Sequence, residues 1–205
     1  MDNAATMRMR ESAYNALIDS LHDVYGNPAS VHAVGVEAYQ AVENARKTIA
    51  VCIGAKPNEI YFTSGATESN NWAINCGKTK KSIVTTNVEH HSILKGIQGR
   101  KYNYIVPVDR NGIVSIKGIN LRDAFVSVIY ANNEIGTIQP IREIGKICRE
   151  RGCIFHSDAT QSIGHIPINV ETDNIDMLSA SAHKFGGAKG IGFLYCRKGV
   201  KLSSF

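Results

Sequence analysis

The feature that most constrains the fold is a repeated alternation between short apolar runs and helix-like segments. Most of the apolar runs are continuous rather than alternating with polar residues. Such runs are typical of strands that are buried on both faces of a mainly parallel sheet. Seven runs of this kind occur: Glu59–Thr63, Ser82–Thr86, Tyr102–Val108, Ala124–Tyr130, Cys153–Ser157, Asp176–Ser181 and Gly192–Cys196.

Helical patterns lie before and between these runs. The longest, Val31–Ile53, places apolar residues three and four positions apart along the chain, as an amphipathic helix does. Shorter helices are predicted at Ser12–His22, Glu68–Asn75, Ser92–Gln98 and Ile141–Arg151, and Gly152 is expected to end the last of them. This order of elements predicts an open, layered α/β sheet in one domain with a short N-terminal arm.

Composition excludes several classes of protein. The 205 residues carry 23 Lys and Arg against 18 Asp and Glu, and charged residues make up 20% of the chain, which argues against disorder. No apolar run approaches the length of a membrane span. Residues 1–6 do not have the pattern of a signal peptide, so we expect none. The basic clusters lack interleaved aromatic residues, which disfavours nucleic-acid binding.

Cysteine usage points to a reducing compartment, so we expect a cytoplasmic protein. The chain has an odd number of cysteines, widely spread and without a CxxC pair. They are Cys52, Cys76, Cys148, Cys153 and Cys196.

Polar residues follow several of the predicted strands, and ligands of open α/β sheets bind at the carboxyl ends of the strands. Ser64–Asn70 is a small, hydroxyl-rich turn that opens a helix. It suits a phosphate group, although an ordinary helix N-terminus is an equal alternative, and it lacks the lysine of a nucleotide P-loop. Glu89, His90 and His91 follow the second strand. Adjacent histidines point in different directions, so we expect no shared metal there.

An acid and a lysine follow the fifth and sixth strands. Asp158 ends a buried strand, and a buried acid needs a cation or several hydrogen-bond donors. Lys184 follows the next strand. The two side chains could form a structural ion pair. Alternatively, Lys184 could form a Schiff base with pyridoxal phosphate while Asp158 keeps the pyridine nitrogen protonated. A phosphate-binding turn, an acid and a lysine together favour the second interpretation.

The sequence around these residues resembles that of the cysteine desulfurases, the NifS/IscS-like branch of the class V aminotransferase-type enzymes that use pyridoxal phosphate. Phe62–Asn70 reads FTSGATESN, and Phe155–Gly164 reads FHSDATQSIG. The other matching segments follow in the family's order: Asp2–Thr6, Gly26–His32, Glu89–His90, Ala131–Gly136, Asp176–Ser181, His183–Lys184 and Lys189–Tyr195.

The resemblance implies roles for residues that bind the ring of the cofactor. Lys184 is implied as the Schiff-base lysine, and Asp158 as the partner of the pyridine nitrogen. Gln161 is expected near the phenolic oxygen. His90 is expected to stack on the ring and to move protons. Asn133 is expected beside the ring and the substrate carboxylate.

The resemblance also implies a phosphate site. Thr67 and the backbone at Ala66, together with Ser181 and His183, are expected to hold the phosphate. No metal site is implied.

The family's fold is a three-layer α/β/α large domain with a mainly parallel seven-stranded sheet, followed by a C-terminal small domain that is absent here. We expect residues 1–20 to form an N-terminal arm and first helix, and residues 21–205 to form the cofactor-binding domain. In the family the nucleophilic cysteine, a substrate-binding arginine and a threonine from the partner subunit lie beyond position 205. None of the five cysteines occupies the position of the nucleophile.

The implied reaction converts L-cysteine to L-alanine and passes sulfur to an enzyme persulfide for iron–sulfur cluster or thio-cofactor synthesis. A homodimer and a sulfur-acceptor or scaffold protein are the implied partners, without nucleic acid or membrane. Two alternatives stay open. One is selenocysteine lyase or another class V lyase, and the other is a truncated, non-catalytic binding or structural relative.

Overall fold

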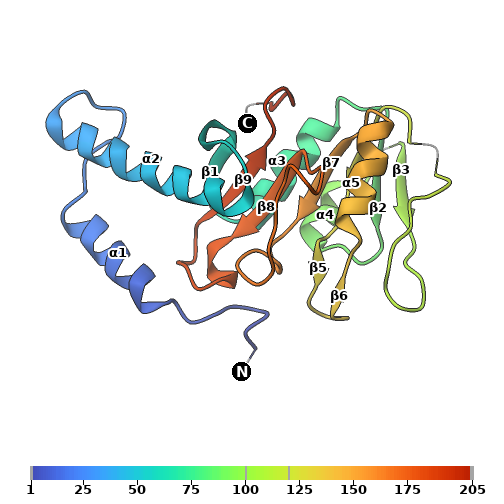
Figure 1. Ribbon diagram of the computed structural model, residues 1–205, viewed down its shortest axis with the longest axis horizontal. Helices are drawn as coiled ribbons and strands as arrows, with labels where there is room; N and C mark the ends of the chain where they lie inside the picture. Colours follow the sequence, from blue (N-terminus) through green and yellow to red (C-terminus); the bar gives the residue numbers. More distant parts are fainter. Residues whose placement is uncertain (1, 100, 120, 204–205) are drawn as a thin grey trace.

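A seven-stranded sheet forms the centre of the protein (Figure 1). The computed structural model describes residues 2–99, 101–119 and 121–203. The strands follow the order β1-β9-β8-β7-β4-β2-β3, and β9 runs antiparallel to both of its neighbours while the other pairs are parallel. The strands are β1 (Ile60–Thr63), β2 (Ser82–Thr86), β3 (Asn103–Val106), β4 (Ala124–Ser127), β7 (Ile154–Asp158), β8 (Met177–Ser181) and β9 (Gly192–Cys196). All seven predicted strands are therefore confirmed.

The predicted helices are also present, with ends that differ by one or two residues. They are α1 (Glu11–His22), α2 (Ala33–Ile53), α3 (Ala66–Gly77), α4 (His91–Gly96) and α5 (Ile141–Glu150). Gly152 follows α5 with a φ of +65°, a conformation that favours glycine and ends the helix as expected. Two short 3₁₀ helices, η1 (Pro57–Glu59) and η2 (Ala182–Lys184), complete the helical elements.

A small hairpin was not predicted. It pairs β5 (Ala131–Asn132) with β6 (Thr137–Ile138) beyond the end of β4. The predicted strand Ala124–Tyr130 ends directly before the hairpin. Its regular part, β4, ends at Ser127, but Val128 and Tyr130 still donate backbone hydrogen bonds to β7. The hairpin continues this part of the chain past the carboxyl edge of the sheet.

Helices cover both faces of the sheet, which confirms the three-layer α/β/α arrangement. On one face, Ile74 of α3 and Ile93 of α4 belong to a buried cluster with Phe125 of β4. On the other face, Ile53 of α2 and Ile144 of α5 belong to a larger buried cluster. Each such side chain contributes roughly 1.5–3 kcal/mol when it is fully buried, so both layers hold the sheet in place.

The N-terminal segment runs along the carboxyl edge of the sheet before α1 begins. Met7 donates a backbone hydrogen bond of 2.9 Å to His183, and Arg10 donates one of 2.9 Å to Gly186. Helix α1 itself buries no residue. The division of the chain at residues 20 and 21 stays a prediction, and residues 1, 100, 120, 204 and 205 of those predicted ranges lie outside the described residues.

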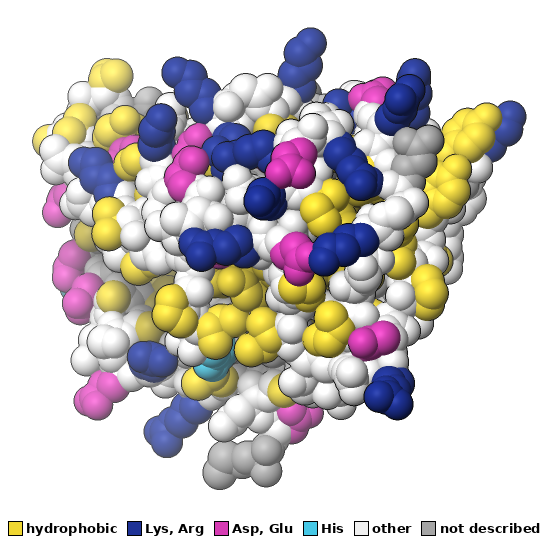
Figure 2. Space-filling view, turned by 45° about the vertical axis from the view of Figure 1, so that its right-hand side comes forward, with side chains coloured by type: hydrophobic (Ala, Val, Ile, Leu, Met, Phe, Trp, Pro, Cys, Tyr) yellow, Lys and Arg dark blue, Asp and Glu magenta, His cyan; other side chains and the backbone are white. Residues whose placement is uncertain are grey.

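The surface carries charges of both signs. On the face shown in Figure 2, Lys and Arg side chains are scattered, with Asp and Glu side chains among them. Across the part of the chain that the structure describes, no helix has the length and apolar character needed to cross a membrane.

Candidate functional site

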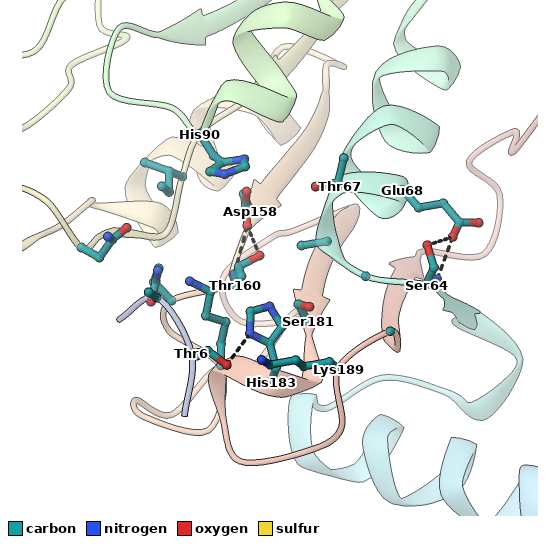
Figure 3. Close-up of a pocket in the computed structure, with 18 residues that line it drawn as sticks. Thr6, Ser64, Thr67, Glu68, His90, Asp158, Thr160, Ser181, His183 and Lys189 are labelled. Atoms are coloured by element: carbon teal, nitrogen blue, oxygen red, sulfur yellow. Dashed lines mark hydrogen bonds between the residues drawn. The ribbon is translucent and has the colours of Figure 1, made fainter. Parts of the chain in front are cut away.

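A cavity of about 580 Å³ lies at the carboxyl edge of the sheet (Figure 3). All nine predicted site residues line it: Ala66, Thr67, His90, Asn133, Asp158, Gln161, Ser181, His183 and Lys184. Nine further lining residues were not among the predicted ones: Ala5, Thr6, Ser64, Gly65, Glu68, Ile129, Thr160, Lys189 and Gly190. The fold thus brings the predicted residues together from separate parts of the chain.

The N-terminus of α3 forms one wall of the cavity. Gly65 is its N-cap and contributes no side-chain hydrogen bond, so the first backbone N–H groups of the helix are open to a ligand. The hydroxyl groups of Thr67 and Ser181 lie at the same wall, and His183 lies nearby (Figure 3). Open amides, the positive end of a helix dipole and hydroxyl groups together suit an anion such as a phosphate group.

Close packing behind Gly65 fixes the position of this wall. A Cβ atom on Gly192 of β9 would lie 2.4 Å from the carbonyl oxygen of Ala180 and 2.7 Å from Cα of Gly65. Only a residue without a side chain allows the backbones of β8, β9 and the α3 turn to approach in this way.

Glu68 lies close to the open amides but is held by its neighbour. Its carboxylate accepts hydrogen bonds from the backbone N–H of Ser64 (2.7 Å) and from the Ser64 hydroxyl (2.6 Å). These bonds lower the pKa of Glu68 below its ordinary value, so the group stays ionised. Figure 3 shows Glu68 turned toward Ser64, on the far side of the helix turn from Thr67.

Asp158 lies at the floor of the cavity with 2% of its surface exposed. One carboxylate oxygen accepts hydrogen bonds from the backbone N–H and the hydroxyl of Thr160, and the other accepts one of 2.7 Å from Nδ2 of Asn70. Three donors satisfy the charged carboxylate without a cation. Among the ion pairs of the described residues, none joins Asp158 to Lys184, so the alternative of a structural ion pair is not what the structure has.

Lys184 reaches the cavity from η2, directly after β8. Its Nζ donates a hydrogen bond to the carbonyl oxygen of Ala4, which also accepts one of 2.9 Å from Nε2 of Gln161. Burial lowers the pKa of the Lys184 amine, and the negative charges of Asp2 and Asp158 partly offset this effect. A lysine with a lowered pKa is closer to the neutral form that acts as a nucleophile.

His183 faces the N-terminal segment. Its Nδ1 lies 3.2 Å from the hydroxyl of Thr6. Burial, followed by the positive charges of Lys184 and Lys189, lowers the pKa of the imidazole. Residues of the N-terminal segment therefore contact both members of the His183–Lys184 pair.

Two titratable residues follow β2, and one of them, His90, lines the cavity. His90 is the N-cap of α4, and its Nδ1 accepts a hydrogen bond from the backbone N–H of Ser92. Glu89 is buried, and burial raises its pKa to about 8. The rings of His90 and His91 are tilted, with centroids 6.2 Å apart. Within residues 2–99, 101–119 and 121–203, no three His, Cys, Asp or Glu side chains are grouped so that they could hold a metal ion.

None of the cysteines lines the cavity. Cys52 is exposed, and the other four are buried. Burial raises the pKa of the Cys148 and Cys153 thiols and raises that of Cys196 to about 12. A thiol reagent should therefore modify one cysteine rapidly in the folded chain and the others only on unfolding. Cys52→Ser should abolish the rapid phase, and a rapid phase that persists in this variant would contradict the expectation.

Some of the lining residues that were not predicted have a local sequence pattern that could have indicated them, and others have none. Thr160 follows Asp158 by two positions, the spacing at which an aspartate accepts hydrogen bonds from its own loop. Lys189 and Gly190 belong to a glycine-rich segment that the sequence already showed. Thr6, in contrast, is 177 positions from His183, which it contacts, and no local pattern indicates that contact.

Known proteins resemble this chain along nearly its full length. The family model described as aminotransferase class-V matches residues 1–204. A cysteine desulfurase IscS of Methanosarcina thermophila is 46% identical over 98% of this chain and 53% of its own length. The mitochondrial cysteine desulfurase of Drosophila melanogaster is 43% identical over 97% of this chain and 46% of its own length.

Solved structures agree in fold. A NifS-like protein superposes with a TM-score of 0.94 at 39% identity, over 100% of this chain and 60% of its own. A structure described as SspA in complex with cysteine gives a TM-score of 0.89 at 36% identity, over 96% of this chain and 60% of its own. The chain spans about half the length of the curated relatives it matches. Because the family model matches nearly every residue, the chain belongs to the aminotransferase class-V family.

Proposed function

We propose that the chain is the cofactor-binding part of a cysteine desulfurase that uses pyridoxal phosphate. The observation that supports this most is the placement of Asp158, Lys184 and the open N-terminus of α3 around one cavity. These are the three groups that the pyridine nitrogen, the aldehyde and the phosphate of this cofactor require. The cysteine desulfurases among the relatives support the same proposal.

The residues present fit the cofactor. The buried carboxylate of Asp158 lies at the cavity floor and would hold a proton on the pyridine nitrogen. Lys184 would bind the aldehyde covalently, and Gln161 would lie by the phenolic oxygen. His90 would lie against the ring, with Asn133 beside the ring and the substrate carboxylate. The phosphate would be held by Thr67, the backbone of Ala66, Ser181 and His183.

Two of these residues would act on protons: Lys184 would move one, and Asp158 would hold one in place. When bound, pyridoxal phosphate accepts the electrons of the bond broken at the α-carbon of the substrate. The amine of Lys184 would move a proton at that carbon. Asp158 would hold the proton of the ring nitrogen throughout, and three hydrogen-bond donors fix the position of its carboxylate.

The proposed substrate is L-cysteine, and one structural relative is described as a complex with cysteine. The sulfur would pass to a cysteine outside residues 1–205, because none of the five cysteines of this chain lines the cavity. A homodimer, a sulfur-acceptor or scaffold protein and a cytoplasmic location belong to the same proposal. The same absence of a cavity thiol favours a second candidate, a relative that binds the cofactor without completing the reaction.

The Lys184→Ala variant tests the proposal. We expect the wild-type chain to absorb visible light after pyridoxal phosphate is added, and borohydride to fix the cofactor to the protein. Lys184→Ala should lose both properties. Lys146→Ala, at an exposed position on α5, is the matched control and should behave like the wild type.

A folded wild-type chain that stays colourless after pyridoxal phosphate is added would contradict the proposal. Equal covalent labelling of the Lys184→Ala variant would contradict it as well. The two candidate functions separate when this chain is combined with the C-terminal half of a cysteine desulfurase. Release of alanine from L-cysteine supports the desulfurase, whereas cofactor binding without alanine supports the non-catalytic relative.

A further inference from the structure

Four polar side chains form a connected row behind the cavity wall. Asn70 Nδ2 donates hydrogen bonds to Asp158 Oδ2 (2.7 Å) and to the Ser92 hydroxyl (2.9 Å). The Ser92 hydroxyl lies 2.7 Å from Nδ1 of His90. The row joins α3, α4 and β7 and runs from the acid at the cavity floor to the imidazole at its edge.

The direction of each hydrogen bond follows from the chemistry of its atoms. An ionised carboxylate only accepts, so the amide nitrogen of Asn70 is the atom that faces Asp158. The second N–H of the same nitrogen points to the Ser92 hydroxyl, which therefore accepts from Asn70. The hydroxyl has one proton, and it donates that proton to Nδ1 of His90.

A second donor reaches the same nitrogen of His90. The backbone N–H of Ser92 lies 3.1 Å from Nδ1 and donates to it. Because Nδ1 accepts from both groups, the proton of the neutral ring lies on Nε2. Nε2 makes no hydrogen bond within the described chain and is the ring nitrogen that remains for a ligand in the cavity.

Burial protects this arrangement from competition by water. Asn70 is 0% exposed, and Ser92 is 9% exposed. The amide oxygen of Asn70 is buried and has no hydrogen-bond partner among the described residues. Burying an unpaired oxygen costs stability, so what Asn70 contributes at this position is its two donors.

We infer that Asn70 and Ser92 are positioning residues that fix His90 in the Nε2-protonated tautomer and connect it to Asp158. The tautomer makes Nε2 of the neutral ring a hydrogen-bond donor toward a ligand in the cavity, so His90 would donate a hydrogen bond there rather than accept one. The use of that donor in catalysis rests on the proposed function, whereas the tautomer follows from contacts of the chain itself.

Nitrogen NMR of the chain labelled with ¹⁵N-histidine, without cofactor, tests the tautomer directly. The His90→Gln variant assigns the His90 signals among those of the seven histidines. At a pH where the His90 ring is neutral, we expect long-range correlations typical of a protonated Nε2 and an unprotonated Nδ1. Ser92→Ala should move the two nitrogen shifts of His90 toward each other, because it removes the hydroxyl donor to Nδ1 and leaves only the backbone N–H to favour one tautomer. Asn70→Ala should do the same to a smaller extent.

Matched controls separate this effect from general loosening of the fold. Ser162→Ala removes a buried hydroxyl outside the row, and Asn71→Ala removes the neighbouring amide on α3. Both should leave the His90 signals unchanged. Ser92→Thr keeps the hydroxyl and should retain the wild-type pattern. The signals of buried His156 report whether each variant is folded.

A wild-type His90 with the proton on Nδ1 would overturn the inference. An unchanged pattern in folded Ser92→Ala would overturn it as well. If that variant does not fold, the wild-type tautomer and Ser92→Thr decide the question. Because no cofactor is present, the tautomer can be established even if the chain fails to bind pyridoxal phosphate, and that failure would count against the proposed function alone.

Discussion

Gly192→Ala is expected to lower the free energy of unfolding by about 1–3 kcal/mol, the usual cost of forcing extra volume into a packed site. The added Cβ would meet the carbonyl oxygen of Ala180 and the Cα of Gly65. Both are backbone atoms, so neither can rotate away. Relief requires β8 and β9 to separate or the α3 turn to move, and the second movement would also displace the amides proposed to hold phosphate.

Urea unfolding followed by circular dichroism measures this effect. Gly96→Ala is the matched control, because its added Cβ would meet the end of the Ile74 side chain at 2.8 Å and Asn71 Oδ1 at 3.3 Å. Both are side-chain atoms that can shift, so the control should lose less stability. Equal unfolding midpoints for Gly192→Ala and the wild type would contradict the prediction.

Glu89→Gln is expected to remove a large pH dependence of stability. Oε1 of Glu89 accepts hydrogen bonds from the Thr86 hydroxyl (2.6 Å) and the backbone N–H of Ile129 (2.8 Å), while Oε2 is buried without a hydrogen-bond partner among the described residues. Burial is the main cause that raises the pKa of Glu89 from its ordinary value of 4.5 to about 8, and the charge of Asp158 adds to it. The group is thus neutral in the folded chain at pH 7.

The sign of the effect follows from the proton count. Between about pH 4.5 and pH 8, the folded state keeps the Glu89 proton and the unfolded state releases it. The contribution of Glu89 to stability therefore falls as pH rises through this window and is constant above it. Glutamine resembles the neutral carboxyl and cannot ionise. The stability advantage of Glu89→Gln should grow from pH 5 to pH 8 to a few kcal/mol, at most roughly 5.

Unfolding free energies measured at a series of pH values test this prediction. Glu150→Gln is the control, because that carboxylate is 63% exposed on α5, and the difference between this variant and the wild type should not vary comparably with pH. Parallel stability curves for the wild type and Glu89→Gln would show that Glu89 is ionised in the folded chain. A neutral Glu89 adds no negative charge near Asp158, the carboxylate proposed to pair with the ring nitrogen of the cofactor.

The sequence by itself determined the strands of the central sheet, the helices that cover it and nine of the residues that line the cavity. Continuous apolar runs such as Ala124–Tyr130 and the spacing of apolar residues in Val31–Ile53 are local properties of the chain. They set where strands and helices form before any distant contact is made. The order of strands and helices then places polar residues such as Asp158 and Lys184 at one edge of the sheet.

Only the tertiary structure decided which groups these residues contact. The β5–β6 hairpin has strands of two residues, too short to leave a pattern in the sequence. The hydrogen bond between Lys184 and the carbonyl of Ala4 joins positions 180 residues apart. Asn70 bonds to Asp158 and to Ser92, which are 88 and 22 residues away in the sequence. Such contacts depend on how strands and helices pack across the whole sheet. The physical reason is that periodicity fixes the face on which a residue lies, whereas a hydrogen-bond partner is fixed only when distant elements meet.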